Sequence, residues 1–573
     1  MKDFLYLKNV ELEKIEKIIP ANSILTSNEN YVLVQAYHSS KAVEDIENYA
    51  FSNMVADSGL VTSYNEARDI VGKGEDIYGS WIKVSKNTVK VRTDHIGAQK
   101  VYYFSNGDNT VITSSMKLML GVLGKLSIKY TLSKEQAILY LYARETKWPQ
   151  TIINEISCFL PSCNVTIRGG VVNYEHYTIS SSSKETPHTT LKNILSNLSN
   201  RKATSTLSGG VDSQCVTNVC KSVGVDTAIS CAYSSEKINN DYNCFNEIPY
   251  AKKFSEDISI NLIEKKFTVD DVVAARKKLL QDIDQPTHDP TSFYLMCRSL
   301  GVYEIDTLIS GMGGDAIFAP IKELNRARIT YSIYYTLLKY LPKKLLHHIC
   351  KLMGFRGPFN FLYQLISNDD KINFFELIDL TRPYHYTSVV ENAISKSAIN
   401  EAKKSYYLLN RDFIFKNYDK HLSFFCVDVE WKLNAAVLLN PDEFNVESSS
   451  KKHNIRAIMP FAMPGFVNSC LQYKGLDRNT QMDLLELSNR DCLISSKSGF
   501  TVPYEEWLIP LFIESINKFL VEKNLSDYLE VDTNYIKKLM KCESLNRSEA
   551  AFIQRIDTLY NYVKINNVSI PCV

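Results

Sequence analysis

Short segments in the first part of the chain have the residue pattern of β-strands. Segments 89–93 and 101–104 combine β-branched, apolar and aromatic residues with alternating polar ones, as in strands that bury one face. Turn residues at 106–109 and 168–170 separate such segments. We therefore predict a mostly antiparallel sheet of hairpins, with some helix, for this part of the chain.

Further along, strand-like and helix-like patterns alternate. Strand-like segments 203–207 and 305–309 are each followed by a glycine-rich turn. After the first turn, apolar residues recur at helical spacing, at Cys215, Val216, Val219, Cys220 and Val223. This succession predicts an α/β domain with a parallel sheet. The pattern over 321–439 is helical and rich in Tyr, Phe, Leu and Lys, so we also expect a helical C-terminal extension.

The composition changes most sharply at 179–187, where a serine run and a proline interrupt every apolar period. Such a segment is typical of a linker. The chain has 573 residues, and single hydrophobic cores stop growing near ~250 to 300 residues. We therefore predict two domains, 1–185 and 186–573.

Composition and charge narrow the class of function. Hydrophobic residues make up 45% of the chain and charged residues 23%, so a core can be buried. The net charge of +1 disfavours a nucleic-acid partner. The 13 cysteines contain no CxxC pair, and we find neither a signal peptide nor an uncharged apolar run of about 18 residues. We expect a reduced, cytoplasmic protein without a membrane span.

The most informative segment is Ser208-Gly-Gly-Val-Asp-Ser213, between a predicted strand and a predicted helix. Two glycines let backbone N–H groups approach phosphate oxygens, and a helix N-terminus adds partial positive charge. Asp212 would repel bare phosphate, so it indicates a divalent cation that bridges phosphates. The simpler alternative is a Gly-Gly turn capped by Ser and Asp. The aspartate within the loop favours the nucleotide site.

This loop resembles the pyrophosphatase loop of the N-type ATP pyrophosphatases, which transfer AMP to a carboxylate or carbonyl and release pyrophosphate. Segment 305–318, Ile-Asp-Thr-Leu-Ile-Ser-Gly-Met-Gly-Gly-Asp-Ala-Ile-Phe, is similar to the Ser-Gly-x-Gly-x-Asp-Glu-x-Phe loop of asparagine synthetase-type enzymes. The resemblance implies ATP and Mg²⁺ as cofactors, with Asp212 and Asp315 as metal ligands and catalytic carboxylates. The nucleotide-binding residues that it implies are Leu207, Ser208, Gly209, Gly210, Val211, Asp212, Ser213, Ser310 and Gly311.

Two further segments resemble the same family. Segment 495–508, Ser-Ser-Lys-Ser-Gly-Phe-Thr-Val-Pro-Tyr-Glu-Glu-Trp-Leu, resembles its lysine loop, and the resemblance implies that Lys497 is catalytic. A lysine can neutralise charge during adenylation and stabilise the oxyanion of the second step. Segment 284–292 resembles a stretch that lines the acyl-substrate side, although a plain proline-rich turn explains it almost as well.

The first domain resembles the glutaminase domain of this family in segments 92–104, 111–117 and 156–170. The resemblance implies a glutaminase-like (Ntn-type) sandwich before an α/β parallel-sheet ATP pyrophosphatase domain. A working glutaminase of this type needs a cysteine as residue 2, whose own α-amino group is the base for its thiol. This chain has Lys2, and no cysteine precedes Cys158. We therefore expect a degenerate glutaminase-like domain and an amine that comes from free ammonia or from the substrate itself.

Departures in the second domain favour an unusual substrate. Met312 stands where asparagine synthetases have Glu, and segment 455–461 has Arg456 for Glu and Ile458 for Arg. Relatives with a dead glutaminase domain include β-lactam synthetase, which is expected to have a Tyr at the position of Met312, and lasso-peptide macrocyclases. The Tyr/Phe-rich helical region favours the larger, more apolar substrate. We therefore favour lasso-peptide macrolactam closure between an N-terminal amine and an Asp or Glu side chain.

Other functions stay open. They include an asparagine synthetase-like amidotransferase that uses free ammonia, a β-lactam synthetase-like cyclase, and an inactive ATP-binding or partner-binding protein. A thiolating or amidating enzyme of tRNA would show CxxC pairs or a basic face, which this sequence lacks. The expected partners are a peptide or small-molecule carboxylate substrate and, by the lasso resemblance, a precursor-processing protease and a leader-binding protein.

Overall fold

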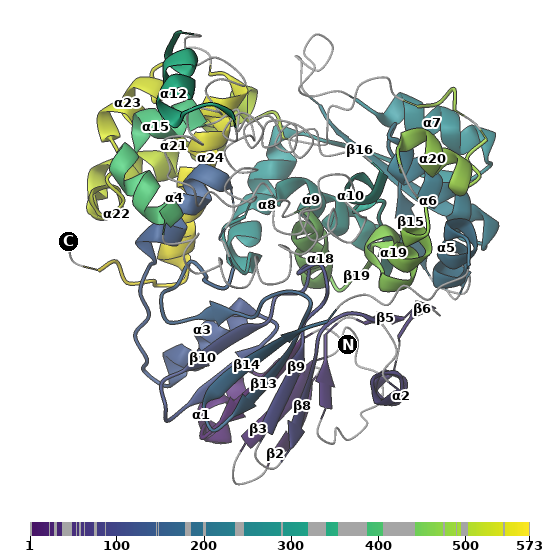
Figure 1. The fold of residues 1–573 in the computed structure, drawn as a ribbon, viewed down its shortest axis with the longest axis horizontal. Helices are drawn as coiled ribbons and strands as arrows, with labels where there is room; N and C mark the ends of the chain where they lie inside the picture. The colour runs from purple at the N-terminus through teal and green to yellow at the C-terminus, as the bar shows by residue number, and fades with distance from the viewer. Residues whose placement is uncertain are drawn as a thin grey trace.

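The structure is a computed structural model, and its helices and strands form two connected parts (Figure 1). It describes residues 3–571 except 22, 28–30, 37–48, 53, 57–58, 62, 74–76, 86–87, 145, 147, 178–184, 197, 199–201, 235–245, 288–289, 319–339, 353–386, 405–441, 474–475, 489, 494–501 and 543–544.

The N-terminal part is a sandwich of two antiparallel sheets. The first sheet has six strands, in the order β12 (Ser157–Cys158), β10 (Tyr102–Ser105), β11 (Thr110–Thr113), β1 (Phe4–Lys8), β3 (Tyr31–Ala36) and β2 (Ser23–Ser27). The second has five, in the order β14 (Val171–His176), β13 (Cys163–Arg168), β9 (Thr88–Arg92), β8 (Trp81–Ser85) and β4 (Tyr49–Phe51). A small third sheet consists of β6 (Gly59–Leu60), β5 (Val55–Ala56) and β7 (Ile77–Tyr78).

Both faces of the first sheet are buried, which explains the nearly continuous apolar sequence of β1. Phe4 and Tyr6 pack with residues of the second sheet, while Leu5 and Leu7 pack toward α3 (Met116–Lys125). In β13, every second residue is buried, as expected for a strand with one covered face. The layers are therefore helix, sheet and sheet. This part also contains α1 (Leu12–Ile15), η1 (Glu16–Ile18) and α2 (Tyr64–Lys73).

The second part is built on a parallel sheet with helices on both faces. Its strand order is β17 (Asn261–Phe267), β16 (Thr227–Tyr233), β15 (Ala203–Thr206), β18 (Thr307–Ile309) and β19 (Arg456–Ile458). One hydrophobic cluster joins the sheet to α5 (Pro187–Ser196), α6 (Val211–Ser222), α7 (Ile248–Asp257), α19 (Pro464–Leu471) and α20 (Arg478–Leu484). The other face of the sheet packs on α9 (Thr291–Leu300) and on Ile455, which immediately precedes β19. Helix α18 (Asp442–Lys452) contacts both α9 and β19. Short elements include η3 (Gly301–Tyr303), α10 (Gly314–Phe318) and η4 (Pro460–Ala462).

A helical body forms around the C-terminal helices (Figure 1). It contains α21 (Tyr504–Glu522), α22 (Asn524–Tyr528), α23 (Thr533–Met540), α24 (Arg547–Ile565), α15 (Thr387–Ala393) and α8 (Val269–Asp282). A helix of the N-terminal part, α4 (Lys134–Ala143), is buried in the same cluster and packs against α24. The two parts therefore share one of the hydrophobic clusters of the protein.

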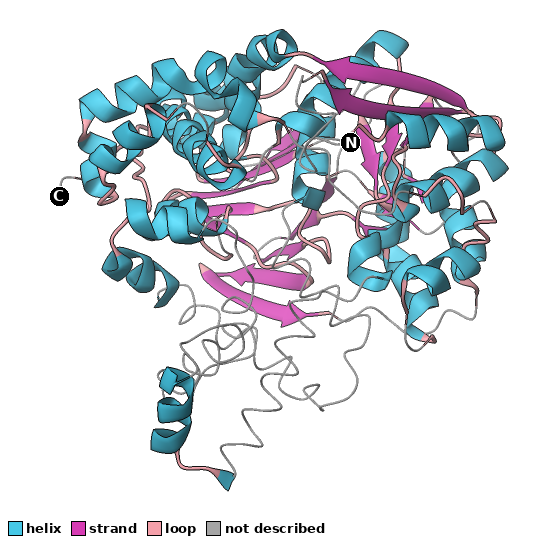
Figure 2. Ribbon diagram, turned by 90° about the horizontal axis from the view of Figure 1, so that it is seen from above, coloured by secondary structure: helices cyan, strands magenta, loops and turns pink. Residues whose placement is uncertain are grey.

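The predicted fold class is confirmed: antiparallel sheets precede a parallel sheet with helices around it (Figure 2). Most of the predicted helical region 321–439 lies outside the described residues; in its described part, α12 (Lys343–Leu352), α15 and residues 396–404 are helical. The predicted boundary at 185/186 stays a prediction, although α5 begins at Pro187. No helix in the described residues is long and apolar enough to cross a bilayer.

Candidate active site

Two glycine-rich loops meet at one edge of the parallel sheet. β15 and β18 are neighbours, and Ser205 pairs in register with Ile309. The loop of residues 208–213, called the phosphate loop below, comes just after β15, and segment 310–314 follows β18 directly. Carboxyl ends of neighbouring parallel strands lie at the same edge of a sheet. The structure therefore brings the two predicted nucleotide-binding segments side by side.

Two serines hold the turn of the phosphate loop. Ser213 Oγ accepts a hydrogen bond from the Ser208 N–H at 3.0 Å and donates to the Gly210 carbonyl oxygen at 2.9 Å. The Ser208 hydroxyl accepts from the Gly210 N–H at 3.1 Å. Gly210, which has no side chain, is the N-cap of α6. The loop therefore leads into a helix N-terminus without a capping side chain at that position, an arrangement that suits an anion.

The second loop packs directly on the first, and only glycine fits at two of its positions. A Cβ atom on Gly311 would lie 2.8 Å from the backbone carbonyl carbon of Asp212. One on Gly314 would collide with the Asp212 carboxylate and lie 2.8 Å from its Cγ. Real Cβ atoms do not approach other atoms this closely, so the glycines are needed for the approach of the two loops. This contact fixes the position of Asp212 next to the start of α10.

Asp212 and Asp315 are bridged by one guanidinium group. Arg478, the first residue of α20, donates from Nη1 to Asp212 Oδ2 at 2.8 Å and from Nη2 to Asp315 Oδ1. Gln481 Nε2 donates to the other oxygen of Asp212 at 2.9 Å. The Asp212 side chain is only 11% exposed, whereas that of Asp315 is 55% exposed. Burial alone would lower the pKa of Arg478, but the charges of both aspartates outweigh it and raise that pKa.

The two carboxylates fit a magnesium ion by the chemistry of their donors. One guanidinium contacts both carboxylates, so both face the same space beside the loops. Among the described residues, no group of three or more His, Cys, Asp or Glu side chains could hold a metal. A pair of carboxylates matches magnesium, which proteins usually bind with one or two carboxylates, phosphate oxygens and water.

The other predicted nucleotide-binding residues lie around the same edge. Leu207 is buried, and its N–H donates to the Ile229 carbonyl oxygen at 2.8 Å. Val211 is the first residue of α6, and Gly209 is buried in the turn before it. The Ser310 N–H donates to the Ile458 carbonyl oxygen at 2.9 Å, which ties the second loop to β19.

The departures from the family pattern lie beside these loops. The Met312 N–H donates to Ser310 Oγ at 3.3 Å, and the Met312 side chain packs against the apolar cluster beneath the sheet. Arg456 and Ile458 begin and end β19, the strand next to β18. All three positions are therefore near the site, as the sequence led us to expect.

Lys497 lies outside the described residues, so its predicted role is not tested. Described residues on either side of 494–501 contact the site elements. Gln214 of α6 donates from Nε2 to the Cys492 carbonyl oxygen at 3.0 Å. After the gap, the hydroxyls of Tyr504 and Thr291 lie 3.0 Å apart, at the starts of α21 and α9.

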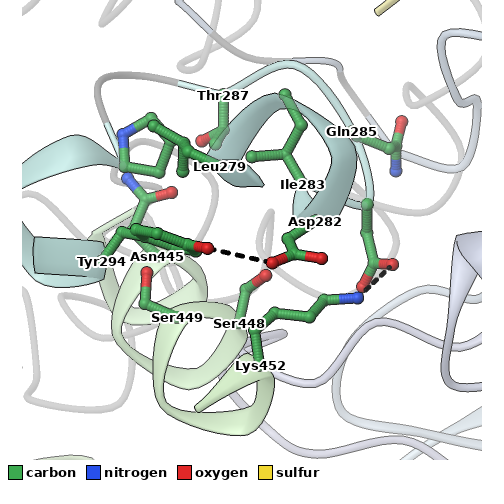
Figure 3. A pocket seen from close by; sticks show the side chains of 12 residues that line it. Leu279, Asp282, Ile283, Gln285, Thr287, Tyr294, Asn445, Ser448, Ser449 and Lys452 are labelled. Atoms are coloured by element: carbon green, nitrogen blue, oxygen red, sulfur yellow. Dashed lines mark hydrogen bonds and ion pairs between the residues drawn. The ribbon is translucent and has the colours of Figure 1, made fainter. Parts of the chain in front are cut away.

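Segment 284–292 lines part of a small pocket between α8, α9 and α18 (Figure 3). Two contacts link polar side chains of the pocket: Tyr294 Oη donates to Asp282 Oδ2 at 3.0 Å, and Lys452 Nζ lies 3.5 Å from Asp284 Oδ1. Asn445 and Ser449 of α18 form the facing wall. Residues 288–289 lie outside the described part of the chain, and a substrate-lining role for this segment stays a prediction.

Comparison with protein families assigns a class to the segment that contains both loops. Residues 196–406 match the family model described as asparagine synthase. This segment is therefore similar to asparagine synthases. The match includes Asp212 and Asp315 and covers less than half of the chain, and it supports an ATP-dependent ligase of the asparagine synthetase superfamily. No curated protein matches the chain.

Sequence reasoning missed Arg478 and Gln481, which lie beyond the matched asparagine synthetase-type segment. A signal was present. Asp477 caps α20 by accepting from the Thr480 N–H at 2.8 Å, and Arg478 follows it in the first turn. A cation at the positive end of a helix dipole is unfavourable unless anions compensate it. The neighbouring Asp477 carboxylate already supplies an anion, so this signal alone does not identify Asp212 and Asp315.

Proposed function

We propose that the chain adenylates a substrate carboxylate with ATP, releases pyrophosphate, and then joins the activated carboxyl group to an amine with release of AMP. The observation that carries this proposal is the pairing of Asp212 and Asp315 on a single cationic group beside the phosphate loop. Binding of a nucleotide alone needs no such pair, whereas charge compensation of a leaving pyrophosphate does.

The residues have separate roles in this proposal. Backbone N–H groups of the phosphate loop and the first turn of α6 hold phosphate oxygens, as the hydrogen-bonded turn of Ser208 and Ser213 permits. Asp212 and Asp315 hold magnesium, which when bound neutralises charge on the leaving pyrophosphate. Lys497 stabilises charge on the α-phosphate and on the tetrahedral oxyanion of the second step.

The amine comes from the substrate in the reaction that we favour. The first cysteines of the chain, Cys158 and Cys163, are buried in strands, and burial raises their thiol pKa values to about 11 and about 12. A thiol needs its thiolate form to attack glutamine, so these residues do not replace the cysteine that a glutaminase of this type needs as its second residue. We therefore propose that residues 1–185 are a degenerate glutaminase-like domain and that 186–573 is the ligase domain.

With an internal amine, amide formation becomes ring closure. We propose that the substrate is a peptide whose N-terminal amine attacks its own activated Asp or Glu side chain, as in lasso-peptide biosynthesis. The nonpolar Met312 in place of the family's Glu supports an acceptor pocket different from that of an asparagine-forming enzyme. A protease that trims the precursor and a protein that binds its leader would be the partners.

A second candidate is an amidotransferase that uses free ammonia. The match to the asparagine synthase family model favours it, because the named reaction of that family amidates aspartate. It differs from ring closure in its co-substrate: it requires ammonium, whereas ring closure does not.

The test measures ATP–pyrophosphate exchange with the chain supplied either with a candidate precursor peptide or with aspartate and ammonium. Ring closure predicts exchange with the peptide alone and a product lighter by one water in mass spectrometry. Exchange only with aspartate and ammonium would support the amidotransferase. Exchange with neither would contradict both reactions.

The matched variants are Asp212→Asn and Asp226→Asn. Asp226 lies in the same domain but forms an exposed ion pair with Lys221, at 2.7 Å. Asp212→Asn should abolish exchange, because it removes one of the two metal-binding carboxylates. Asp226→Asn should leave exchange unchanged. Full exchange by folded Asp212→Asn would remove this residue from the proposed mechanism.

A further inference from the structure

Arg478 occupies the position between the two carboxylates where a divalent cation would bind. Its two terminal nitrogens donate to different residues, Asp212 and Asp315. Gln481 donates to the remaining Asp212 oxygen and is completely buried. Both oxygens of Asp212 are therefore hydrogen-bonded, and a metal ion that bridged Asp212 and Asp315 would have to displace the guanidinium from between them.

We propose that Arg478 acts as an internal cation that competes with the divalent metal for Asp212 and Asp315, and that it transfers to phosphate oxygens when metal and nucleotide bind. This inference rests on the proposed function, because it assumes that the phosphate loop binds pyrophosphate groups. Arg478 lies outside the sequence motifs of the site, and its proposed ligand is the phosphate oxygens.

The Arg478 guanidinium has room to contact either the two carboxylates or bound phosphate oxygens. Arg478 is in the first turn of α20, a helix that packs against α6 and α10, and these two helices carry Asp212 and Asp315. Its side chain is 34% exposed, so it is not enclosed by the core. A planar guanidinium binds carboxylates and phosphates with the same two-pronged hydrogen bonding. A short movement would therefore exchange one partner for the other.

Gln481 has a different part in this arrangement. It holds Asp212 from the buried side, one turn after Arg478 on the same helix, while its Oε1 atom has no partner among the described residues. Buried amides are normally fully hydrogen-bonded. We infer that Gln481 keeps the Asp212 carboxylate oriented whichever cation contacts its other oxygen.

Charge explains why such a cation is useful. Two carboxylates held close together repel each other, and Asp212 is largely removed from water. Arg478 compensates them before the metal arrives. The same positive charge then adds to the metal in neutralising the phosphates. The competition weakens binding of metal alone and favours joint binding of metal and nucleotide.

The test titrates the whole chain with Mn²⁺ alone, followed by electron paramagnetic resonance, and with pyrophosphate at saturating Mg²⁺, followed by calorimetry. Arg478→Ala should bind Mn²⁺ roughly tenfold more tightly than wild type, because a charge-assisted competitor is lost. The same variant should bind pyrophosphate more weakly. Equal or weaker Mn²⁺ binding, or unchanged pyrophosphate binding, would overturn the proposal.

Two further variants keep this test interpretable. Arg490→Ala removes a neighbouring arginine that pairs with the exposed Asp483 instead of the loops, and it should bind both probes as wild type does. Arg478→Lys keeps the charge but cannot span two carboxylates, so its Mn²⁺ affinity should lie between those of wild type and Arg478→Ala. Thermal melting shows which variants are folded. Neither titration needs turnover, so failure of the exchange assay would count against the proposed function alone.

Discussion

The Lys451 ammonium lies 2.6 Å from the Asp3 carboxylate, and both residues are buried. Asp3 immediately precedes β1, and Lys451 is in the last turn of α18, so this ion pair joins the two parts of the protein. Ser114 completes it: its hydroxyl donates to Asp3 at 2.8 Å, and its carbonyl oxygen accepts from Lys451 at 3.2 Å. Burial alone would raise the pKa of Asp3, but the charge and hydrogen bond of Lys451 outweigh this effect and lower the pKa below its ordinary value.

Removal of one partner from this pair should be costly. Lys451→Met leaves the Asp3 carboxylate buried without its cation, and we expect a loss of about 3–5 kcal/mol in the free energy of unfolding, as for other broken buried pairs. The double variant Asp3→Asn with Lys451→Met should recover most of that loss. Urea unfolding followed by circular dichroism measures both values.

The matched control is Lys134→Met. Lys134 pairs with Glu530 at 2.7 Å, but both side chains are substantially exposed. Exposed pairs contribute at most about 1 kcal/mol, so this variant should be nearly as stable as wild type. If Lys451→Met cost no more than Lys134→Met, the buried pair would not be the connection that its geometry indicates.

Acid should destabilise the protein through His95. This side chain is buried, and burial together with the charge of Arg92 lowers its pKa to about 3. In the unfolded chain its pKa is near ~6.5, so below that pH the unfolded state binds a proton that the folded state does not. The contribution of His95 therefore makes the free energy of unfolding fall as pH decreases from about 6.5 toward about 3.

The variant His95→Gln tests this sign. It removes the titrating ring, so the slope of the unfolding free energy between pH 4 and 6 should decrease by up to about 1.4 kcal/mol per pH unit. Urea unfolding at several pH values gives the slope for each protein. An unchanged slope would mean that His95 is not kept neutral in the folded state.

The sequence predicted the phosphate loop and its neighbour because each consists of adjacent residues with a local chemical meaning. Glycines, serines and aspartates in a short turn after a strand indicate both a tight backbone turn and the kind of ligand that the turn can bind. The parallel pairing of β15 and β18 then brings the two loops to one edge, which the predicted α/β class already implied. The proximity of the two loops could therefore be predicted from the sequence, whereas nucleotide binding by them stays a prediction.

Arg478 and α4 were not predicted, for a common physical reason. Helical periodicity identifies which face of a helix is apolar but not which element covers it. For α4, buried residues are distributed around the whole helix, so the pattern indicated burial without naming α24 as the partner. Arg478 is a charged residue at the start of an ordinary capped helix. Its partner Asp212 is distant in the sequence and becomes its neighbour only in the folded protein.

Gly314→Ala should slow adenylation without unfolding the protein. The new Cβ would collide with the Asp212 carboxylate and also approach the Phe461 ring to 2.9 Å, so Asp212 would have to move from its position opposite Asp315. We expect ATP–pyrophosphate exchange to fall by at least about tenfold, since misplacement by ~1 Å is enough for larger losses. The assay is isotope exchange with the substrate that supports it in wild type.

Gly124→Ala is the control for this substitution. Gly124 is in α3, and a Cβ there would meet no atom within 4 Å. Alanine should stabilise that helix by roughly 0.5–1 kcal/mol and leave exchange unchanged. If Gly314→Ala retained full exchange, the close contact between the two loops would not be needed for the carboxylate pair.

Lys497→Ala should separate nucleotide binding from product formation. The phosphate loop, Asp212 and Asp315 remain, so the affinity for ATP measured by calorimetry should change little. Loss of one preorganised charge at a developing oxyanion usually costs roughly 10²–10³-fold in rate, and we expect single-turnover product formation, measured by mass spectrometry, to fall by that factor. Lys518→Ala removes a lysine whose exposed side chain pairs with Glu514 at 2.7 Å, and it should behave as wild type. Equal losses of ATP affinity and product formation in Lys497→Ala would instead assign Lys497 to ground-state binding of the nucleotide.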